Sequence, residues 1–368
     1  MKTTAAVLTE VGKPFEIVEL DLDGPKEGEV LVRYVAAGLC HSDLHLLKGD
    51  FPSRLPIVGG HEGAGIVEEV GPGVTKVQPG DHVLASFIPS CGECRYCRTG
   101  RQNLCNLGEF LLDGQLPDGT FRFHLNGEDA GGMCAVGSFS EFGTLSQHSV
   151  IKINENHPLD RAVLASCGVP TGWGTAINAA GVRTGDTTVV YGAGGVGMNA
   201  VQGAAVAGAK YVVVVDPVEF KRKTALELGA THAFADADTA LDAVWELTHG
   251  EGAESAMVIV GDVDADVVTS AFNIVGKAGT VAITAMGPWD DLSVQLPAAQ
   301  LAMYQKTIKG CIFGQFNPQY DVPRLLGLYE AGTLKLDELV TREYKLEDVN
   351  QGYDDLRAGE LIRGVVTY

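Results

Sequence analysis

Three groups of residues in this sequence have types and spacings that could do chemistry. The first is CGECRYCRTGRQNLC, in which Cys91, Cys94, Cys97 and Cys105 follow the spacing Cys-x2-Cys-x2-Cys-x7-Cys. Four thiolates on one short segment can complete a tetrahedral shell around zinc. Such a closed shell has no open position, so we expect a structural zinc here. An iron–sulfur cluster and unliganded thiols are the alternatives.

The second group is dispersed over GLCHSDLHLLKGD, GGHEGAGIVEEVG and SCGVPTGWGTA. Cys40, His61 and Cys167 match the two-cysteine, one-histidine set of a catalytic zinc whose fourth position is open. An open zinc is a Lewis acid, which stabilises an alkoxide or polarises a carbonyl oxygen. Taken singly, each residue has a simpler interpretation, as a small core cysteine or a hydrogen-bonded histidine.

Polar neighbours of these residues could complete the chemistry. Asp43 could accept the free ring N–H of His61 and fix its tautomer. Ser42 and His45 could pass a proton from the zinc-bound oxygen to solvent.

The third group is YGAGGVGMNAVQGAAVAGAKYVVVVD, where Gly192, Gly194 and Gly197 form G-x-G-x-x-G between an apolar strand and a helix. Asp216 ends the next strand, about 20 residues on, as the dinucleotide-binding fingerprint requires. Its carboxylate would bind the adenosine ribose hydroxyls and repel a 2′-phosphate, which favours NAD over NADP. A related fold that binds S-adenosylmethionine or a nucleotide is the alternative. Zinc and NAD together indicate hydride transfer between an alcohol and a carbonyl.

The surrounding patterns predict the elements that position these groups. Residues 1 to about 150 read as short strands of period two, broken by Gly and Pro, which is typical of an antiparallel β region. Residues from about 170 to 311 alternate apolar strands with helical patterns, which predicts a parallel sheet covered on both faces. The last segment, from about Phe313, is expected to pack back on the first part.

Composition limits the class of protein. A chain of 368 residues with 45% hydrophobic content should form two domains. The formal charge of −20 argues against nucleic-acid partners and against anionic membranes. The sequence shows no signal peptide and no apolar run long enough to span a bilayer. We therefore expect a cytoplasmic protein with reduced thiols.

The whole chain resembles the zinc-dependent alcohol dehydrogenases of the medium-chain dehydrogenase/reductase superfamily, through GHEGAGIVEEVG, the four-cysteine lobe, CGVPTGWGTA and GAGGVG. The resemblance implies an α/β fold in which a Rossmann doubly wound parallel sheet is inserted into a GroES-like β catalytic domain. The catalytic domain would comprise residues 1–169 and 312–368, with the structural zinc lobe at 91–105. The NAD-binding domain would comprise residues 170–311.

The resemblance also implies roles for single residues. Two zincs per chain are expected, the catalytic one on Cys40, His61 and Cys167. Glu62 resembles the acid behind that zinc, an occasional alternative ligand. Ser42 and His45 resemble the proton relay of the family.

The cofactor contacts that the resemblance implies are His41, Thr171, Gly192, Gly194, Gly195, Val196, Gly197, Asp216, Lys221 and Arg363. Thr171 and Val196 would contact the nicotinamide, and Lys221 the adenosine ribose. Arg363 would pair with the pyrophosphate. Many relatives carry arginine where this chain has His41, whose charge at pH 7 is only partial.

GGHEGAGIVEEVGPGV, GTFRFH and VVVVDPVEFKRKTALELGATHAF resemble the actinobacterial nicotinoprotein alcohol dehydrogenases, assayed with N,N-dimethyl-4-nitrosoaniline. In that group NAD stays bound, and a mycofactocin-type redox carrier is the implied acceptor. An ordinary dehydrogenase with dissociable NAD and a glutathione-dependent formaldehyde dehydrogenase are the alternatives. A non-catalytic member of the fold would be expected to lack a ligand or the relay. The expected partners are a small alcohol or aldehyde and further copies of the chain, in a homodimer or homotetramer.

Overall fold

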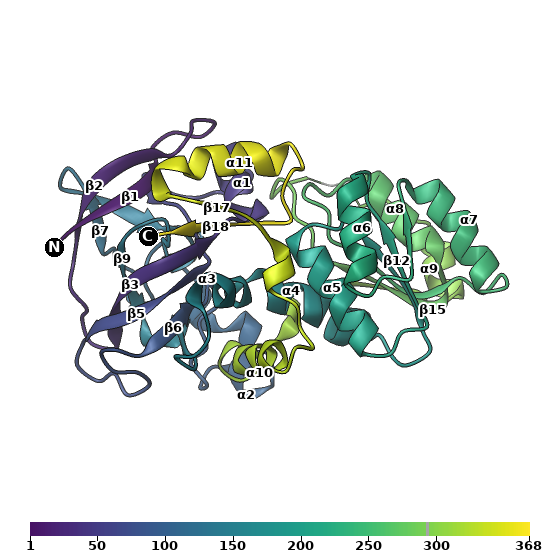
Figure 1. Ribbon diagram of the computed structural model, residues 1–368, viewed down its shortest axis with the longest axis horizontal. Coiled ribbons are helices and arrows are strands. Elements are labelled where there is room, and N and C mark those ends of the chain that lie inside the picture. Colours follow the sequence, from purple (N-terminus) through teal and green to yellow (C-terminus); the bar gives the residue numbers. More distant parts are fainter. Residues whose placement is uncertain (292–293) are drawn as a thin grey trace. The chain divides into compact units, whose positions relative to one another are not determined.

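A computed structural model of the chain describes residues 1–291 and 294–368. These residues form two compact units, one of Met1–Cys167 with Asn317–Tyr368 and the other of Gly168–Phe316. The boundaries expected from the sequence lie after residues 169 and 311. The two ends of the chain, purple and yellow in Figure 1, therefore belong to one unit.

The first unit contains a small barrel and a larger sheet. The closed barrel consists of β1 (Lys2–Leu8), β2 (Glu16–Leu22), β7 (Phe123–Leu125), β8 (Glu128–Gly132) and β4 (Ile57–Val58). The sheet runs in the order β10 (Val150–Lys152), β6 (His82–Ala85), β5 (Gly63–Val70), β3 (Glu29–Gly38), β18 (Arg363–Thr367) and β17 (Val340–Tyr344), with β9 (Phe142–Ser146) paired to β3.

Strand β3 is central to this unit because both of its faces are buried. Val30, Val32 and Tyr34 belong to one hydrophobic cluster. Leu31, which points the other way, packs into a second cluster that fills the barrel. Its alternating apolar residues thus join the sheet to the barrel.

The C-terminal strand β18 completes the sheet by pairing antiparallel with β3, where Val365 lies opposite Gly38. The helices of this unit are α1 (His41–Lys48), α2 (Arg95–Arg98), α3 (Leu159–Ala162), α10 (Pro318–Glu330) and α11 (Val349–Arg357). Helices α1 and α11 bury Leu44 and Tyr353 in one shared core. The last residues of the chain are therefore part of the structure that carries Cys40.

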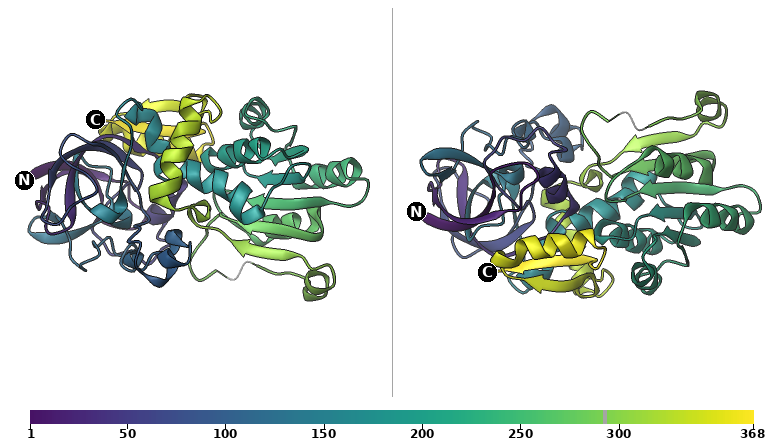
Figure 2. Two further views of the ribbon diagram at one scale, coloured as in Figure 1. Left: turned by 90° about the horizontal axis from the view of Figure 1, so that it is seen from below. Right: turned by 90° about the horizontal axis from the view of Figure 1, so that it is seen from above.

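The second unit is a six-stranded parallel sheet in the order β13 (His232–Phe234), β12 (Tyr211–Val215), β11 (Thr187–Tyr191), β14 (Ala253–Val258), β15 (Val275–Ile283) and β16 (Thr307–Gly310). Its helices are α4 (Gly168–Gly174), α5 (Gly195–Val206), α6 (Glu219–Glu227), α7 (Ala237–Leu247), α8 (Ala265–Ile274) and α9 (Ala298–Met303). Helices lie on both faces of the sheet (Figure 2), which explains the continuous apolar run YVVVV of β12.

This strand order is that of the dinucleotide-binding Rossmann fold, in which ligands bind where the order reverses. The predicted fold class is confirmed, since the second unit is a parallel doubly wound sheet and the first is a β unit whose strands pair mostly antiparallel, with β17–β18 and β4–β8 as parallel pairs. None of the helices within residues 1–291 and 294–368 has the length and apolar character needed to cross a membrane.

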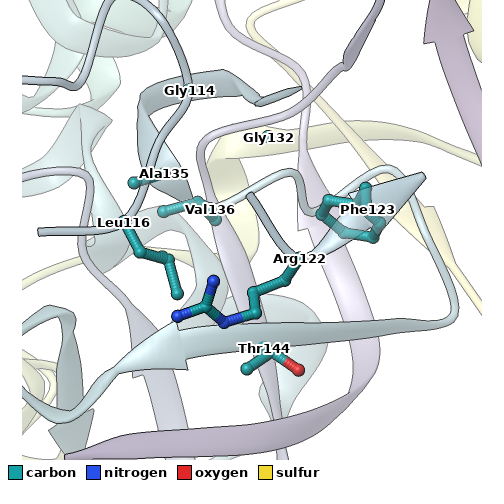
Figure 3. A pocket seen from close by; sticks show the side chains of 8 residues that line it. All are labelled: Gly114, Leu116, Arg122, Phe123, Gly132, Ala135, Val136 and Thr144. Carbon is teal, nitrogen blue, oxygen red and sulfur yellow. The ribbon is translucent and has the colours of Figure 1, made fainter. Parts of the chain in front are cut away.

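A pocket in the first unit is lined in part by a buried arginine. It is lined by Gly114, Leu116, Arg122, Phe123, Gly132, Ala135, Val136 and Thr144 (Figure 3). Arg122, whose side chain is 1% exposed, directs its guanidinium to the carboxylates of Glu29 and Asp118, to Thr120 and to the carbonyl of Phe121. All five N–H donors are therefore used, and we interpret this pocket as structural.

Removing one partner of the Arg122–Glu29 pair should destabilise the protein strongly. Arg122→Met leaves the Glu29 carboxylate buried and uncompensated, which should lower the free energy of unfolding by about 3–5 kcal/mol. Chemical denaturation followed by circular dichroism measures the change. The double variant Arg122→Met/Glu29→Leu should recover a large part of the loss, and a double variant less stable than Arg122→Met would contradict this explanation.

Candidate active site

The four-cysteine lobe brings its sulfur atoms together within one short segment of the chain. The Sγ atoms of Cys91, Cys94, Cys97 and Cys105 all lie within 4.8 Å of one another. Cys91 and Cys97 are 3.8 Å apart, and neither forms a disulfide. Zinc–sulfur bonds of about 2.3 Å in a tetrahedron place sulfur atoms roughly 3.8 Å apart. The lobe therefore fits a tetrahedral metal.

Backbone amides donate to these sulfurs and favour their thiolate forms, although burial raises the pKa of Cys97 and Cys105. The N–H groups of Glu93 and Cys94 both donate to Cys91 Sγ at 3.3 Å, and Cys91 N–H donates to Cys105 Sγ at 3.4 Å. Backbone hydrogen bonds from Asn106 and Cys97 lower the pKa of Cys94 to about 6. Amide donors favour the charged form of a thiol, which is the form that binds zinc.

A second cluster brings together residues that are far apart in the sequence. Ligand atoms of Cys40, His61, Glu62 and Cys167 all lie within 4.8 Å of one another, and all four residues are buried. Cys40 stands between β3 and α1, His61 and Glu62 precede β5, and Cys167 follows a short helical turn. Two thiolates and an imidazole fit zinc, with room for one further ligand.

The carboxylate of Asp43 lies close to Nδ1 of the His61 ring. Its Oδ2 lies 3.2 Å from His61 Nδ1, an ion-pair distance although the two atoms are not aligned as a hydrogen bond, while Oδ1 accepts from the N–H of Gly60 at 2.9 Å. Both side chains are at most 2% exposed. Burial alone would lower the pKa of His61, but Asp43 and Cys40 raise it well above its ordinary value. Asp43 thus lies beside His61 as the sequence suggested, while its role as acceptor of the ring N–H stays a prediction.

Glu62 is held by Arg363 of strand β18. Arg363 Nη2 donates to Glu62 Oε2, and both side chains are at least nine-tenths buried. Glu62 Oε1, also buried, has no hydrogen-bond partner within the described part of the chain. Burial raises the pKa of Glu62 to about 7, although Arg363 opposes the shift. An unpaired carboxylate oxygen beside two cysteines and a histidine fits an occasional metal ligand.

This contact was not foreseen from the sequence, where Arg363 was assigned to the pyrophosphate. The pyrophosphate role stays a prediction. Gly38 permits the contact, because a Cβ atom there would overlap Glu62 Oε2.

The predicted relay residues lie on one short helix. Ser42 Oγ is 3.7 Å from Cys40 Sγ, and the rings of His41 and His45 are 5.6 Å apart. His45 Nδ1 lies 2.7 Å from Asp50 Oδ2. Asp50 was missed in the sequence, although the helix-ending Gly49 directly before it could have drawn attention to this position.

The glycine loop of the second unit runs from β11 into α5. Gly192 has a φ of 93°, and Gly197 is so close to the strand that a Cβ atom would overlap the carbonyl oxygen of Gly192. At Gly194, by contrast, a Cβ atom would meet nothing within 4 Å. Gly195 and Val196 form the first turn of α5. Gly192 thus allows a tight turn, Gly194 leaves space for a ligand to approach the backbone, and Gly197 allows the helix to pack closely on the strand. A dinucleotide-binding loop requires all three.

Asp216 follows β12 and is 6% exposed. Its two carboxylate oxygens each accept a backbone hydrogen bond of 2.8 Å, from Ala193 and from Val218. Arg222, another residue missed in the sequence, donates to the carbonyl of Asp216. Burial lowers the pKa of Lys221, and Asp216 opposes the shift. The Asp216 carboxylate is therefore held in place by a hydrogen bond from the backbone of the glycine loop.

Thr171 lies in α4 and is buried, and its carbonyl accepts from Thr175. Its contact with the nicotinamide stays a prediction, as do the cofactor roles of His41 and Val196.

Known proteins resemble this chain over its whole length. The family model "Alcohol dehydrogenase GroES-like domain" matches residues 26–155, and "Zinc-binding dehydrogenase" matches residues 195–331. An NDMA-dependent alcohol dehydrogenase of Amycolatopsis methanolica is 62% identical over 100% of this chain and 99% of its own. Alcohol dehydrogenase B of Mycobacterium tuberculosis is 47% identical over 100% of this chain and 99% of its own. The crystal structure of benzyl alcohol dehydrogenase from Acinetobacter calcoaceticus matches this structure with a TM-score of 0.92 and 32% sequence identity. The match covers 100% of this chain and 99% of that chain.

The two clusters predict the metal content of purified protein. Denatured protein should release two zinc ions per chain, whereas Cys97→Ser and Cys40→Ser should each release one, because each removes a ligand of a different cluster. Atomic emission spectroscopy measures the ratio. Cys311→Ser, outside both clusters, should keep two ions, and a variant of one cluster that kept both would contradict the assignment.

The glycine loop predicts opposite effects for two similar substitutions. Gly197→Ala should abolish stable folding of the second unit, because the methyl group meets backbone. Gly194→Ala should change the melting temperature by less than about 2 °C, because a Cβ atom at this position meets no other atom within 4 Å. It should nevertheless weaken NAD binding at least tenfold, because the methyl group enters the space that the pyrophosphate needs. Unimpaired NAD binding by Gly194→Ala, measured by calorimetry after any bound cofactor has been removed, would be the contrary outcome.

Proposed function

Because the chain belongs to the zinc-dependent alcohol dehydrogenases of the medium-chain dehydrogenase/reductase superfamily, we propose that it oxidises alcohols to aldehydes or ketones with NAD. The observation that carries the proposal is the buried cluster of Cys40, His61 and Cys167. When bound, zinc supplies a Lewis acid for the substrate oxygen and NAD supplies a hydride acceptor.

The chain's own residues hold and orient the reacting groups. Cys40, His61 and Cys167 would hold the zinc, while Asp43 keeps the second ring nitrogen of His61 available to the metal. Ser42 and His45 would carry away the proton that the alcohol hydroxyl loses. In the other unit, Gly194 and the N-terminus of α5 would receive the pyrophosphate, and Asp216 the adenosine ribose.

The electron acceptor is the finer part of the proposal. The relative from Amycolatopsis methanolica is named as NDMA-dependent and shares 62% of its residues with this chain. We propose that NAD likewise remains bound here between turnovers and is reoxidised in place by an external acceptor, such as a mycofactocin-type carrier. The natural substrate would be a small alcohol or aldehyde.

Resident NAD can be tested directly. Protein purified without added cofactor and then denatured should release about one NAD per chain, measured by chromatography. It should also reduce the nitrosoaniline dye with an alcohol and no added NAD. Protein that carries almost no NAD and depends on added NAD for activity would instead be an ordinary dehydrogenase.

The variant Cys40→Ser should impair the zinc site without affecting the NAD site. Alcohol turnover should fall by at least 10³-fold, because the metal ligand is lost, a loss comparable to that of other major catalytic groups. The NAD released per chain should stay unchanged, since the glycine loop belongs to the other unit. Retained turnover in zinc-free protein would refute the mechanism.

We also propose assembly through the second unit, as a dimer or a dimer of dimers. Strand β16 is an edge strand, and Met303, Tyr304 and Ile312 near it are at least 42% exposed. An apolar, unpaired edge is a surface on which a second copy can add its strand. Light scattering after size-exclusion chromatography determines the mass, and Ile312→Lys should shift it toward the monomer.

A further inference from the structure

Aromatic packing fixes the position of Tyr353 on helix α11. The centre of its ring is 5.9 Å from that of Phe15 and 6.1 Å from that of Phe139. Tyr353 also belongs to the same buried cluster as Leu44 of α1. Asn350, one turn earlier on α11, accepts from the N–H of Phe15 and donates to its carbonyl, each at 2.9 Å. The helix is thus fastened to the chain beside the ring of Tyr353.

The same aromatic cluster lies against the backbone that precedes His61. A Cβ atom on Gly60 would come within 2.7 Å of Phe139, so a side chain at this position would overlap the ring. The N–H of Gly60 donates to Asp43 Oδ1 at 2.9 Å, and Asp43 Oδ2 lies 3.2 Å from His61 Nδ1. The aromatic rings, the Gly60 backbone and the Asp43 carboxylate therefore form one packed region next to His61.

The hydroxyl of Tyr353 is buried in this region without an aligned hydrogen-bond partner. Asp43 Oδ2 is buried as well, and neither atom has such a partner among residues 1–291 and 294–368. Burial raises the pKa of Tyr353 well above its ordinary value, and the negative charge of the nearby Asp43 carboxylate raises it further. A buried donor and a buried acceptor that both lack partners gain free energy when they pair with each other.

We propose that Tyr353 is a positioning residue for the zinc site, whose hydroxyl donates a hydrogen bond to Asp43 Oδ2 in the zinc-loaded protein. The proposal rests on the proposed function, which assigns the zinc of the buried cluster to Cys40, His61 and Cys167. A carboxylate oxygen has two lone pairs, so Oδ2 can accept from Tyr353 and from His61 Nδ1–H together. With Nδ1 protonated, His61 Nε2 keeps the lone pair that a metal requires. Tyr353 thereby holds Asp43, and Asp43 holds the orientation of the His61 ring.

The variant Tyr353→Phe tests this role, because it removes only the hydroxyl and keeps the packed ring. Dialysis against buffers of fixed free zinc, followed by atomic emission spectroscopy, gives a binding midpoint for each cluster. Cys40→Ser, which keeps only the four-cysteine lobe, identifies the midpoint of the lobe. In Tyr353→Phe the midpoint of the buried cluster should move to at least tenfold higher free zinc, since loss of an outer contact of a metal ligand typically weakens binding by 10–100-fold. The midpoint of the lobe should not move.

A double variant separates this role from packing. If Tyr353 acts through Asp43, its hydroxyl has no effect on zinc binding once the carboxylate is gone. The midpoint of Asp43→Ala/Tyr353→Phe should therefore lie within about twofold of the midpoint of Asp43→Ala, whereas the effects of two independent residues would add.

A matched control is Tyr191→Phe. The Tyr191 hydroxyl is also buried without an aligned partner in the described part of the chain, but it belongs to β11 of the second unit. Both zinc midpoints of this variant should match the wild type. A wild-type midpoint of the buried cluster in Tyr353→Phe, or full additivity with Asp43→Ala, would overturn the role of Tyr353 alone. Wild-type protein that binds zinc only in the four-cysteine lobe would overturn the proposed function and this proposal together.

Discussion

The buried contact between Arg363 and Glu62 is the constraint on which the first unit depends. The two residues are 301 positions apart, and neither could stay buried without the other, since an unpaired charge in the interior is strongly destabilising. Arg363 is the first residue of β18, which pairs with β3. Glu62 directly follows His61 in the sequence. The geometry of the metal cluster therefore depends on the C-terminal strand closing the sheet.

The two metal clusters are built on different principles. The four cysteines of the lobe lie within one short segment, whose turns and amide donors bring the sulfur atoms together. The cluster of Cys40, His61 and Cys167 comes from three separate segments, each placed by a strand or helix end. Its support is correspondingly wider, because Asp43 on α1 connects His61 to the N–H of Gly60. Such outer contacts fix the orientation of a metal ligand and are as much a part of the site as the ligand itself.

Steric constraint dominates in the second unit. The glycine loop and Asp216 form one rigid piece, in which the acid accepts a hydrogen bond from Ala193 within the loop. The fold class and this loop could be predicted because strand periodicity and G-x-G-x-x-G are local patterns. The motif requires glycine at position 197 because a side chain there would overlap the carbonyl oxygen of Gly192. The contact of Arg222 with the Asp216 carbonyl could not be predicted, because its side chain could equally have extended into solvent.

By itself, the sequence determined the alternation of strands and helices, the four-cysteine lobe and the glycine loop. Each of these depends on residues within one short stretch, where spacing and backbone geometry decide the outcome. Only the tertiary structure decided that Arg363 meets Glu62, that Arg122 meets Glu29 and that His45 is enclosed beside Asp50. These contacts depend on strand register and on burial, which no local pattern contains. A buried charge acquires its partner only when distant segments have packed, and that packing sets the surroundings of the site.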